Sequence, residues 1–343
     1  MRAVVLGAGV AGLACAVELA GRGAAVEVLE RGERLGAACC SWYAGGMLAP
    51  WCERESAEPL VAALGLESLT WWPRKFPGTV LKGSLVVAHG RDVGELRQFA
   101  RRTEHYEWLD GDGIAALEPD LAGRFSRALY FPEEGHLDPR AALAALAAHL
   151  ATLGVPIRFA VDAEACQQAL AAAQAADCAL IDCRGLAARD VLQELRGVKG
   201  EMLVVRLPEV SLSRPVRVLH PRVPVYIVPR GDGHYMIGAT TIESDQPTRI
   251  TARSLLELLG AAYALHPAFG EAEIVEIGTG VRPAFPDNLP RVQRIGSTVY
   301  VNGLYRHGFL LAPALARHAA EHVLGTGHPS EVMHADSRQR RLA

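Results

Sequence analysis

The sequence lacks a strong excess of charge of either sign, and it lacks any long apolar run. Its 35 Lys and Arg residues against 38 Asp and Glu residues give a formal net charge of −3. This balance predicts no attraction to nucleic acid or to an anionic membrane surface. No stretch reaches the roughly 18 uninterrupted apolar residues that a membrane-spanning helix needs. We therefore expect no nucleic-acid partner, no membrane partner and a cytoplasmic location.

A secretory signal peptide is the alternative interpretation of the apolar N-terminus, in which Arg2 precedes a run of apolar residues. Glycines at positions 7, 9 and 12 and the charged Glu18 and Arg22 interrupt this segment, and no convincing cleavage site follows. The N-terminus is therefore expected to belong to the folded protein.

Motifs for metal binding and for disulfide bonds are also missing. The 7 cysteines form no Cys-x-x-Cys pair, and the 12 histidines show no paired ligand spacing, which argues against zinc. Cys39 and Cys40 are adjacent and make a poor disulfide pair. The cysteines are therefore expected to be reduced thiols, which is typical of a cytosolic protein, and we expect no metal site.

The N-terminus contains a dinucleotide-binding pattern. The apolar run Ala3–Leu6 leads into Gly7-Ala8-Gly9-Val10-Ala11-Gly12, a helix pattern follows, and a second apolar run ends in Glu30-Arg31. In this order the first glycine permits a tight turn, the second lets backbone approach a pyrophosphate, and the third lets the helix pack close to the sheet. The helix N-terminus offers N–H groups to the phosphates. Glu30 lies 18 residues after Gly12, where its carboxylate can accept hydrogen bonds from a ribose.

The rest of the chain predicts an α/β protein with two domains, since 343 residues, half of them hydrophobic, can form two cores. Ala-rich helices are expected over 140–153 and 167–176, and a buried strand over 178–182. Residues 200–240 predict an antiparallel meander of strands with a turn at the Pro-Arg-Gly-Asp-Gly segment. A final helix is expected over 312–324.

Five segments carry a resemblance because they occur together and in order. They are the glycine turn with Glu30-Arg31, the loop from Ser41 to Glu53, Tyr226–Arg230 with Ile237–Thr240, Gly280–Pro283, and Gly303–Pro313. As a set they resemble the D-amino-acid oxidase superfamily of FAD enzymes, in particular the thiazole-pathway glycine oxidases. The resemblance extends from end to end of the chain.

The resemblance implies a fold of two domains built from interleaved segments. A Rossmann-type FAD-binding domain would comprise 1–80, 136–199 and 278–343. A substrate-binding domain with a mixed, largely antiparallel sheet would comprise 81–135 and 200–277. The flavin ring is expected between them, in the kind of crevice where ligands usually bind.

The resemblance also implies an activity, the FAD-dependent oxidation of glycine or a small amine-bearing carboxylate. The products would be an imine, then glyoxylate, and hydrogen peroxide from dioxygen, in support of thiazole (thiamine) synthesis. FAD is expected to be non-covalent, because no cysteine falls in the last 60 residues, where an attachment would be expected. A sarcosine or D-amino-acid oxidase or dehydrogenase, a non-catalytic dinucleotide-binding redox module, and a homo-oligomer all stay open at this point.

Substrate-binding roles follow from the same resemblance. Arg282 would anchor the substrate carboxylate with its planar guanidinium, Tyr226 would add a hydroxyl, and Glu53 and Met47 would line the site, with Arg306 as the next cation. Each has a structural alternative. Arg282 could be a surface turn residue, Tyr226 a core residue, Glu53 a charge at a helix start and Met47 a gap-filling side chain. No catalytic residue is assigned, because hydride transfer from a neutral amine needs no base.

The expected FAD contacts gather at the glycine turn, the loop after it, two later strand ends and the start of the final helix. They are Gly7, Gly9, Val10, Ala11, Gly12, Glu30, Arg31, Cys40, Ser41, Gly45, Gly46, Met47, Ala163, Gly185, Arg306, His307, Gly308, Phe309 and Leu310. Three departures from the family pattern accompany them. After Phe159 an Ala-rich helix is expected where the family has a small β-hairpin. Thr241 stands where a larger apolar residue would narrow the pocket, and Arg184 places a charge that could contact phosphate.

Overall fold

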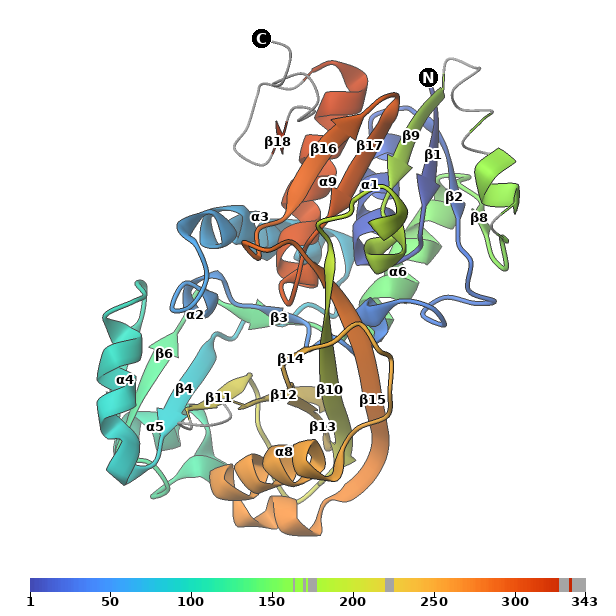
Figure 1. Cartoon of the computed structure of the whole chain (residues 1–343). Helices are drawn as coiled ribbons and strands as arrows, with labels where there is room; N and C mark the ends of the chain where they lie inside the picture. Colours follow the sequence, from blue (N-terminus) through green and yellow to red (C-terminus); the bar gives the residue numbers. More distant parts are fainter. Residues whose placement is uncertain (163, 169–170, 172–177, 220–224, 327–332, 335–343) are drawn as a thin grey trace.

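The protein contains two large β-sheets joined by a pair of long strands, as the computed structural model in Figure 1 shows. The structure describes residues 1–162, 164–168, 171, 178–219, 225–326 and 333–334. The helix expected over 167–176 therefore lies largely outside the described residues. The combination of parallel and antiparallel sheets with covering helices confirms the expected fold class.

Over the residues that the structure describes, the first sheet has seven strands in the order β18-β16-β17-β9-β1-β2-β8. Its centre is parallel, since β1 pairs in parallel with β2 and β9, and β9 pairs in parallel with β17. The strands are β1 (Arg2–Leu6), β2 (Ala25–Leu29), β8 (Ile157–Arg158), β9 (Cys178–Asp182), β16 (Arg291–Ile295), β17 (Thr298–Asn302) and β18 (Met333–His334). With α1 (Val10–Gly21) between β1 and β2, the unit expected at the N-terminus is confirmed.

Four helices share one hydrophobic core with this sheet: α1, α3 (Pro59–Lys75), α6 (Pro139–Thr152) and α9 (Gly308–Leu324). Leu13 of α1, Trp72 of α3 and Leu315 of α9 are fully buried in that core. Helix α1 is buried over most of its surface, which explains why its sequence is small and apolar on nearly every side.

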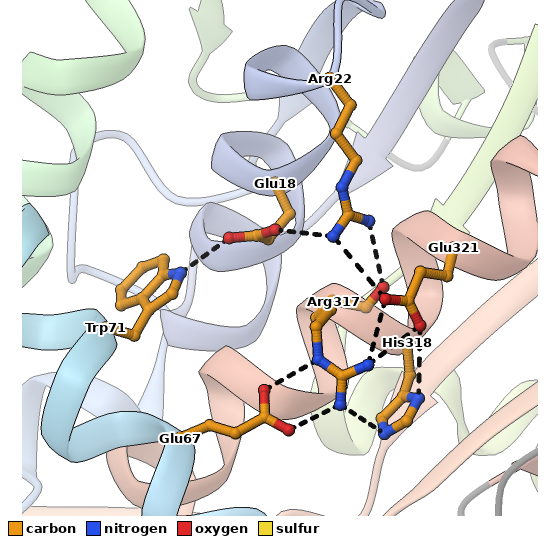
Figure 2. A network of polar contacts seen from close by, with 7 residues as sticks. All are labelled: Glu18, Arg22, Glu67, Trp71, Arg317, His318 and Glu321. Carbon is orange, nitrogen blue, oxygen red and sulfur yellow. Dashed lines mark hydrogen bonds and ion pairs between the residues drawn. The ribbon is translucent and has the colours of Figure 1, made fainter. Parts of the chain in front are cut away.

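A network of ion pairs ties α1, α3 and α9 together at their polar edges (Figure 2). The Arg317 guanidinium of α9 lies 2.6 Å from Glu67 of α3 and 3.0 Å from Glu321. Glu18 of α1 accepts a 2.7 Å hydrogen bond from the indole of Trp71. These side chains are partly exposed, so the network fixes the relative positions of the helices more than it stabilises the fold.

The last helix begins four residues before the expected range of 312–324, because it tolerates an internal proline. Helix α9 starts at Gly308 and contains Pro313 in its second turn. A proline has no N–H to donate to the carbonyl four residues earlier, which here is Phe309. The indole N–H of Trp72 donates to that carbonyl at 2.8 Å instead. A side chain from α3 therefore satisfies the acceptor that Pro313 leaves free.

The second sheet is mixed and mostly antiparallel, in the order β14-β10-β13-β12-β11-β4-β6-β5, with β15 paired to β10. Its strands are β4 (Ser84–Ala88), β5 (Glu107–Asp110), β6 (Arg127–Phe131), β10 (Arg196–Arg206), β11 (Val216–Leu219), β12 (Val225–Gly231), β13 (His234–Gly238), β14 (Ile242–Glu243) and β15 (Glu273–Ala284). Strand β13 pairs antiparallel with both β10 and β12, so the expected meander is confirmed.

Short helices and one small sheet complete the fold. They are α2 (Pro50–Glu53), α4 (Val93–Ala100), α5 (Gly111–Leu117), α8 (Ala252–Leu265), and the pair β3 (Met47–Leu48) and β7 (Gly135–His136). Within the described ranges, no helix is both long and apolar enough to cross a membrane.

Strands β10 and β15 pair along their whole length and run from the second sheet up to the first (Figure 1). Both cross the segment boundaries expected at residues 199 and 277. Gly278 and Gly280 interrupt the strand pattern in the sequence. In the fold, Tyr43 packs against Gly278 and Cys40 against Gly280, where a Cβ would lie 2.5 and 3.2 Å from them, respectively.

Candidate active site

The glycine turn between β1 and α1 leaves no room for side chains at two of its glycines. Gly7 has a φ of +96°, and a Cβ there would lie 2.8 Å from the carbonyl oxygen of Cys183. A Cβ on Gly12 would lie 1.8 Å from the Gly7 carbonyl oxygen. Gly9 is different, because a Cβ there would meet only side-chain atoms, the Ser41 hydroxyl at 3.4 Å and the Cys39 Cβ at 3.7 Å. Its missing side chain leaves the start of α1 open.

The N-terminus of α1 suits a phosphate group. Gly9 is the N-cap and offers no side-chain cap, and the first turn contains no acidic residue. One N–H, that of Val10, donates to the Ser41 hydroxyl at 3.2 Å. The first N–H groups of a helix, among them that of Ala11, have no acceptor within the helix and carry its positive dipole end. The turn therefore fits the pyrophosphate of a dinucleotide.

Glu30, which follows β2, is buried, and its carboxylate fixes the backbone of the glycine turn. Its two carboxylate oxygens accept the N–H groups of Ala8 and Gly32, each at 2.7 Å. A carboxylate oxygen has lone pairs for a second donor, so the ribose role expected for Glu30 is compatible with this structural one. Arg31 beside it is exposed.

The loop between β2 and β3 is held by Arg230, a cation for which the sequence motifs predict no role. Arg230 of β12 is largely buried and donates to the carbonyls of Ala44, Gly45 and Leu137 at 2.9, 3.0 and 2.7 Å. Gly46 has a φ of +73°, and a Cβ there would lie 2.1 Å from the Leu137 carbonyl oxygen. The backbone of this loop is therefore fixed where residues 44–47 line a cavity.

A cavity of about 310 Å³ opens beside this loop and brings together all five expected substrate residues. Its lining comes from the loop and β3, from α2, from strands of the second sheet, from α8 and from the start of α9. The lining residues are Ala44–Met47, Glu53, Arg217, Val225, Tyr226, Ala239–Ile242, Arg253, Ser254, Glu257, Arg282 and Arg306–Leu310.

Four arginines line this cavity, and Arg282 is the one whose guanidinium has no carboxylate partner among the described residues. Its Nη1 donates to the carbonyl of Thr240 at 3.1 Å. A Cβ on Gly200 would lie 2.1 Å from its Nη2, so the guanidinium lies across a bare stretch of β10. By contrast, Arg217 and Arg306 both pair with Glu53. Arg282 is therefore free to bind an anion.

Tyr226 of β12 lines the cavity with its ring against the loop. A Cβ on Gly45 would lie 2.7 Å from that ring, and the hydroxyl makes no hydrogen bond within the described part of the chain. Burial, opposed by the charge of Arg282, raises the pKa of the phenol. The hydroxyl is therefore protonated near neutral pH and can donate a hydrogen bond.

Glu53 at the end of α2 is buried between three basic side chains. One oxygen contacts the guanidinium of Arg217, and the other lies 2.7 Å from that of Arg306 and 3.5 Å from Nδ1 of His307. Burial raises the pKa of Glu53, but the charges of Arg306 and Arg217 outweigh burial, and the pKa is held well below its usual range. Glu53 is thus an anion with both oxygens engaged.

His307, the residue before α9, is neutral at physiological pH. Burial lowers its pKa to about 4; the charge of Glu53 opposes this shift, and the nearby arginines add to it. Neither Glu53 nor His307 therefore titrates near pH 7.

Sequence reasoning missed Arg217, and it gave Arg230 and Thr240 only membership of a motif. Arg217 stands between the buried residues Val216 and Val218 of β11. A charge inside an otherwise apolar strand was the available signal, because a buried charge needs a partner.

Several expected FAD contacts lie away from this cavity. Gly185 follows β9, and its carbonyl accepts from the Asn302 side chain at 2.9 Å. Cys40 packs against Gly280, and Ala163 lies outside the described residues.

The two residues that depart from the family pattern have different surroundings. Arg184 pairs with Asp182 at 2.7 Å and with Asp190, so its guanidinium is already engaged by carboxylates. Thr241 lines the cavity.

Comparisons with known proteins agree with this arrangement. Residues 2–322 match the family described as FAD dependent oxidoreductase (DAO). A protein of Rhizobium etli named as a thiamine biosynthesis oxidoreductase, ThiO, is 58% identical over 331 residues, covering 94% of this chain and 97% of the relative. A glycine oxidase of Geobacillus kaustophilus is 30% identical over 342 residues, covering 90% and 89%. The chain spans about half the length of bifunctional ThiO/ThiG relatives.

The fold is similar to that of a solved enzyme as well. The crystal structure of glycine oxidase from Geobacillus kaustophilus superposes with a TM-score of 0.78 at 25% identity, covering 96% of both chains.

Proposed function

Because the chain belongs to the DAO family of FAD-dependent oxidoreductases, we propose that it oxidises glycine, or a small amine-bearing carboxylate, to an imine that hydrolyses to glyoxylate. Dioxygen would be the electron acceptor and hydrogen peroxide the second product. The relatives named as ThiO and glycine oxidase support this substrate and a place in thiamine synthesis. A cytoplasmic location and a homo-oligomer are predictions that accompany the proposal.

The observation that carries the proposal is the position of Arg282. Its guanidinium lines the same cavity as Tyr226 and has no acidic partner among the described residues. A planar guanidinium can hold both oxygens of a carboxylate in two charge-assisted hydrogen bonds. Tyr226 can donate a further bond. Together these contacts would fix the direction in which the substrate Cα–H points.

The residues present fit FAD. The glycine turn and the start of α1 would hold the pyrophosphate, Glu30 the ribose, and the 44–47 loop with the start of α9 the ring. Bound FAD would supply the two-electron oxidation of the amine, while the protein orients the substrate and excludes water. The N–H groups at the start of α9 and the Arg306 cation would favour negative charge near them.

The titration of the cavity residues predicts how the reaction depends on pH. Glu53 has both oxygens paired with arginines, and the pKa of His307 is lowered to about 4. Neither Glu53 nor His307 is thus a base with a pKa near 7. We expect the substrate amine to arrive without its extra proton, so that kcat/KM rises with pH up to the pKa of the amine itself.

Peroxide production across glycine, sarcosine and several D-amino acids tests the proposal. Glycine is expected to be among the best substrates. Strong preference for sarcosine or for a D-amino acid would assign the chain to a different oxidase. Absence of peroxide with every amine, in a protein that retains FAD, would favour a non-catalytic redox module.

We also propose that the chain divides into an FAD-binding domain (1–80, 136–199, 278–343) and a substrate-binding domain (81–135, 200–277). The seven-stranded sheet and its helices support the first unit, and the nine-stranded sheet supports the second. Strands β10 and β15 cross from one to the other.

A further inference from the structure

A buried ion pair, Lys199 with Glu201, lies on the face of β10 opposite to the one that Arg282 covers. Lys199 and Glu201 are 3% and 0% exposed, and the Lys199 ammonium lies 2.7 Å from Oε1 of Glu201. Neither residue lines the cavity. Because side chains alternate along a strand, Gly200 between them faces the other side, where Arg282 lies across it.

Thr240 connects the two faces. Its hydroxyl lies 3.1 Å from Oε2 of Glu201 and accepts the Glu201 N–H at 2.9 Å. Its own N–H donates to the Glu201 carbonyl at 3.2 Å. Its carbonyl then accepts from Nη1 of Arg282 at 3.1 Å. Three contacts to one buried residue therefore set the position of the carbonyl that holds the guanidinium.

The ion pair also fixes the segment that leads into α8. The Lys199 ammonium donates to the Thr248 hydroxyl and to the Arg249 carbonyl, both at 3.0 Å. Burial raises the pKa of Glu201, but its hydrogen bonds to Lys199, Ser254 and Thr240 lower it overall. Thr240, which contacts Glu201, and Ser254 of α8, which contributes to this shift, both line the cavity.

Burying a charged pair costs desolvation free energy, and a well-packed apolar pair often stabilises a fold as well or better. Stability alone therefore gives no reason for this pair. We propose that Lys199, Glu201 and Thr240 are positioning residues that hold the Arg282 guanidinium in the orientation that binds the substrate carboxylate. This inference rests on the proposed function, because it assigns Arg282 the role of anchor.

Thr240→Val in the FAD-loaded protein tests most directly the contacts that lead from Glu201 through Thr240 to Arg282, called here the Thr240 relay. Valine keeps the branched shape and the backbone carbonyl but removes the hydroxyl that contacts Glu201. With acetate as the probe, titrated by the change in flavin absorbance, we expect its Kd to rise about two- to tenfold. KM for glycine should rise in parallel, and FAD content should not change. Thr240→Ser, which keeps the hydroxyl, should restore the wild-type Kd.

Glu201→Gln should weaken acetate binding further, because it leaves the Lys199 charge without its partner. Glu118→Gln is the matched control. Glu118 forms another buried ion pair in the same sheet domain, 2.7 Å from Arg214, but neither residue lines the cavity. The control should lower the melting temperature and leave the Kd of acetate unchanged. If Glu201→Gln does not fold, the Thr240 variants decide the question.

A double variant shows whether Thr240 acts through Arg282. In an Arg282→Lys background, Thr240→Val should cause little further loss of acetate binding, because the guanidinium it positions is gone. An unchanged Kd in Thr240→Val, or an equal loss in both backgrounds, would overturn the relay. Acetate that binds Arg282→Ala as tightly as the wild type would instead overturn the anchor role, and with it the proposed function's site.

Discussion

Replacing Arg282 by lysine keeps a positive charge in the cavity but removes the planar fork. One donor of the wild-type guanidinium is committed to the Thr240 carbonyl at 3.1 Å, and its other N–H groups donate to no residue that the structure describes, so they can bind the carboxylate. A lysine ammonium is a point charge without this planar fork, so it can bind only one carboxylate oxygen well. Losing one charge-assisted hydrogen bond costs about 1.5–3 kcal/mol. This corresponds to about a ten- to hundredfold loss of kcat/KM, and Arg282→Ala should lose more.

The assay is peroxide formation from glycine at fixed dioxygen, with acetate inhibition measured in parallel. Arg253→Lys is the matched control, because Arg253 lines the same cavity but is exposed and 4.0 Å from Glu257. Such an exposed pair contributes about 0–1 kcal/mol, so this control should stay close to wild-type activity. Both variants should keep their FAD, because neither residue belongs to the glycine turn.

Two results would refute this reasoning. If Arg282→Ala oxidises glycine like the wild type, the carboxylate is held elsewhere, and Arg306 is the next cation to test. If Arg282→Ala loses FAD, the residue supports the fold, and the substrate site has been placed wrongly.

Three further predictions follow from buried contacts. Glu30→Ala should lose FAD on gel filtration while its far-UV circular dichroism is kept, since the ribose acceptor is lost together with the acceptor of two N–H groups; equal FAD retention would contradict this. Burial raises the pKa of Glu134 from 4.5 to about 8, so the folded protein binds this proton more tightly than the unfolded chain, and stability falls as pH rises through that range. Glu134→Gln should therefore gain stability relative to wild type between pH 5 and pH 8 in urea titrations, and a pH-independent difference would be the opposing result. Trp72→Phe should lower the free energy of unfolding by about 1–3 kcal/mol, since it leaves the Phe309 carbonyl without a donor; no change in urea would show that this bond does not matter.

The sequence predicts those features that depend on local spacing. The glycines at 7, 9 and 12 and the acid at Glu30 stand within one strand–helix–strand unit, so their roles follow from short-range geometry. The meander over 200–240 is predicted for the same reason, because alternation and a turn motif mark it. Arg282 and Tyr226 were found through the family resemblance, and their spacing alone predicts nothing.

Features that depend on partners far along the chain could not be predicted. Glu53, Arg217 and Arg306 belong to three separate segments of the sequence, and only folding brings their side chains together. The early start of α9 was missed because Pro313 suggests a later one, and the Trp72 indole that compensates for it lies 237 residues away from Phe309. The Thr240 relay depends on the register between β10 and the end of β13, which no local pattern specifies.

The central claim is that the cavity holds a glycine-sized amino acid against FAD for oxidation. Anaerobic addition of glycine to the purified yellow protein, followed by its absorbance spectrum, tests this most directly. The flavin band should bleach with glycine and recover on admitting air, with hydrogen peroxide formed. A spectrum that stays oxidised with glycine, sarcosine and D-amino acids alike would contradict the claim.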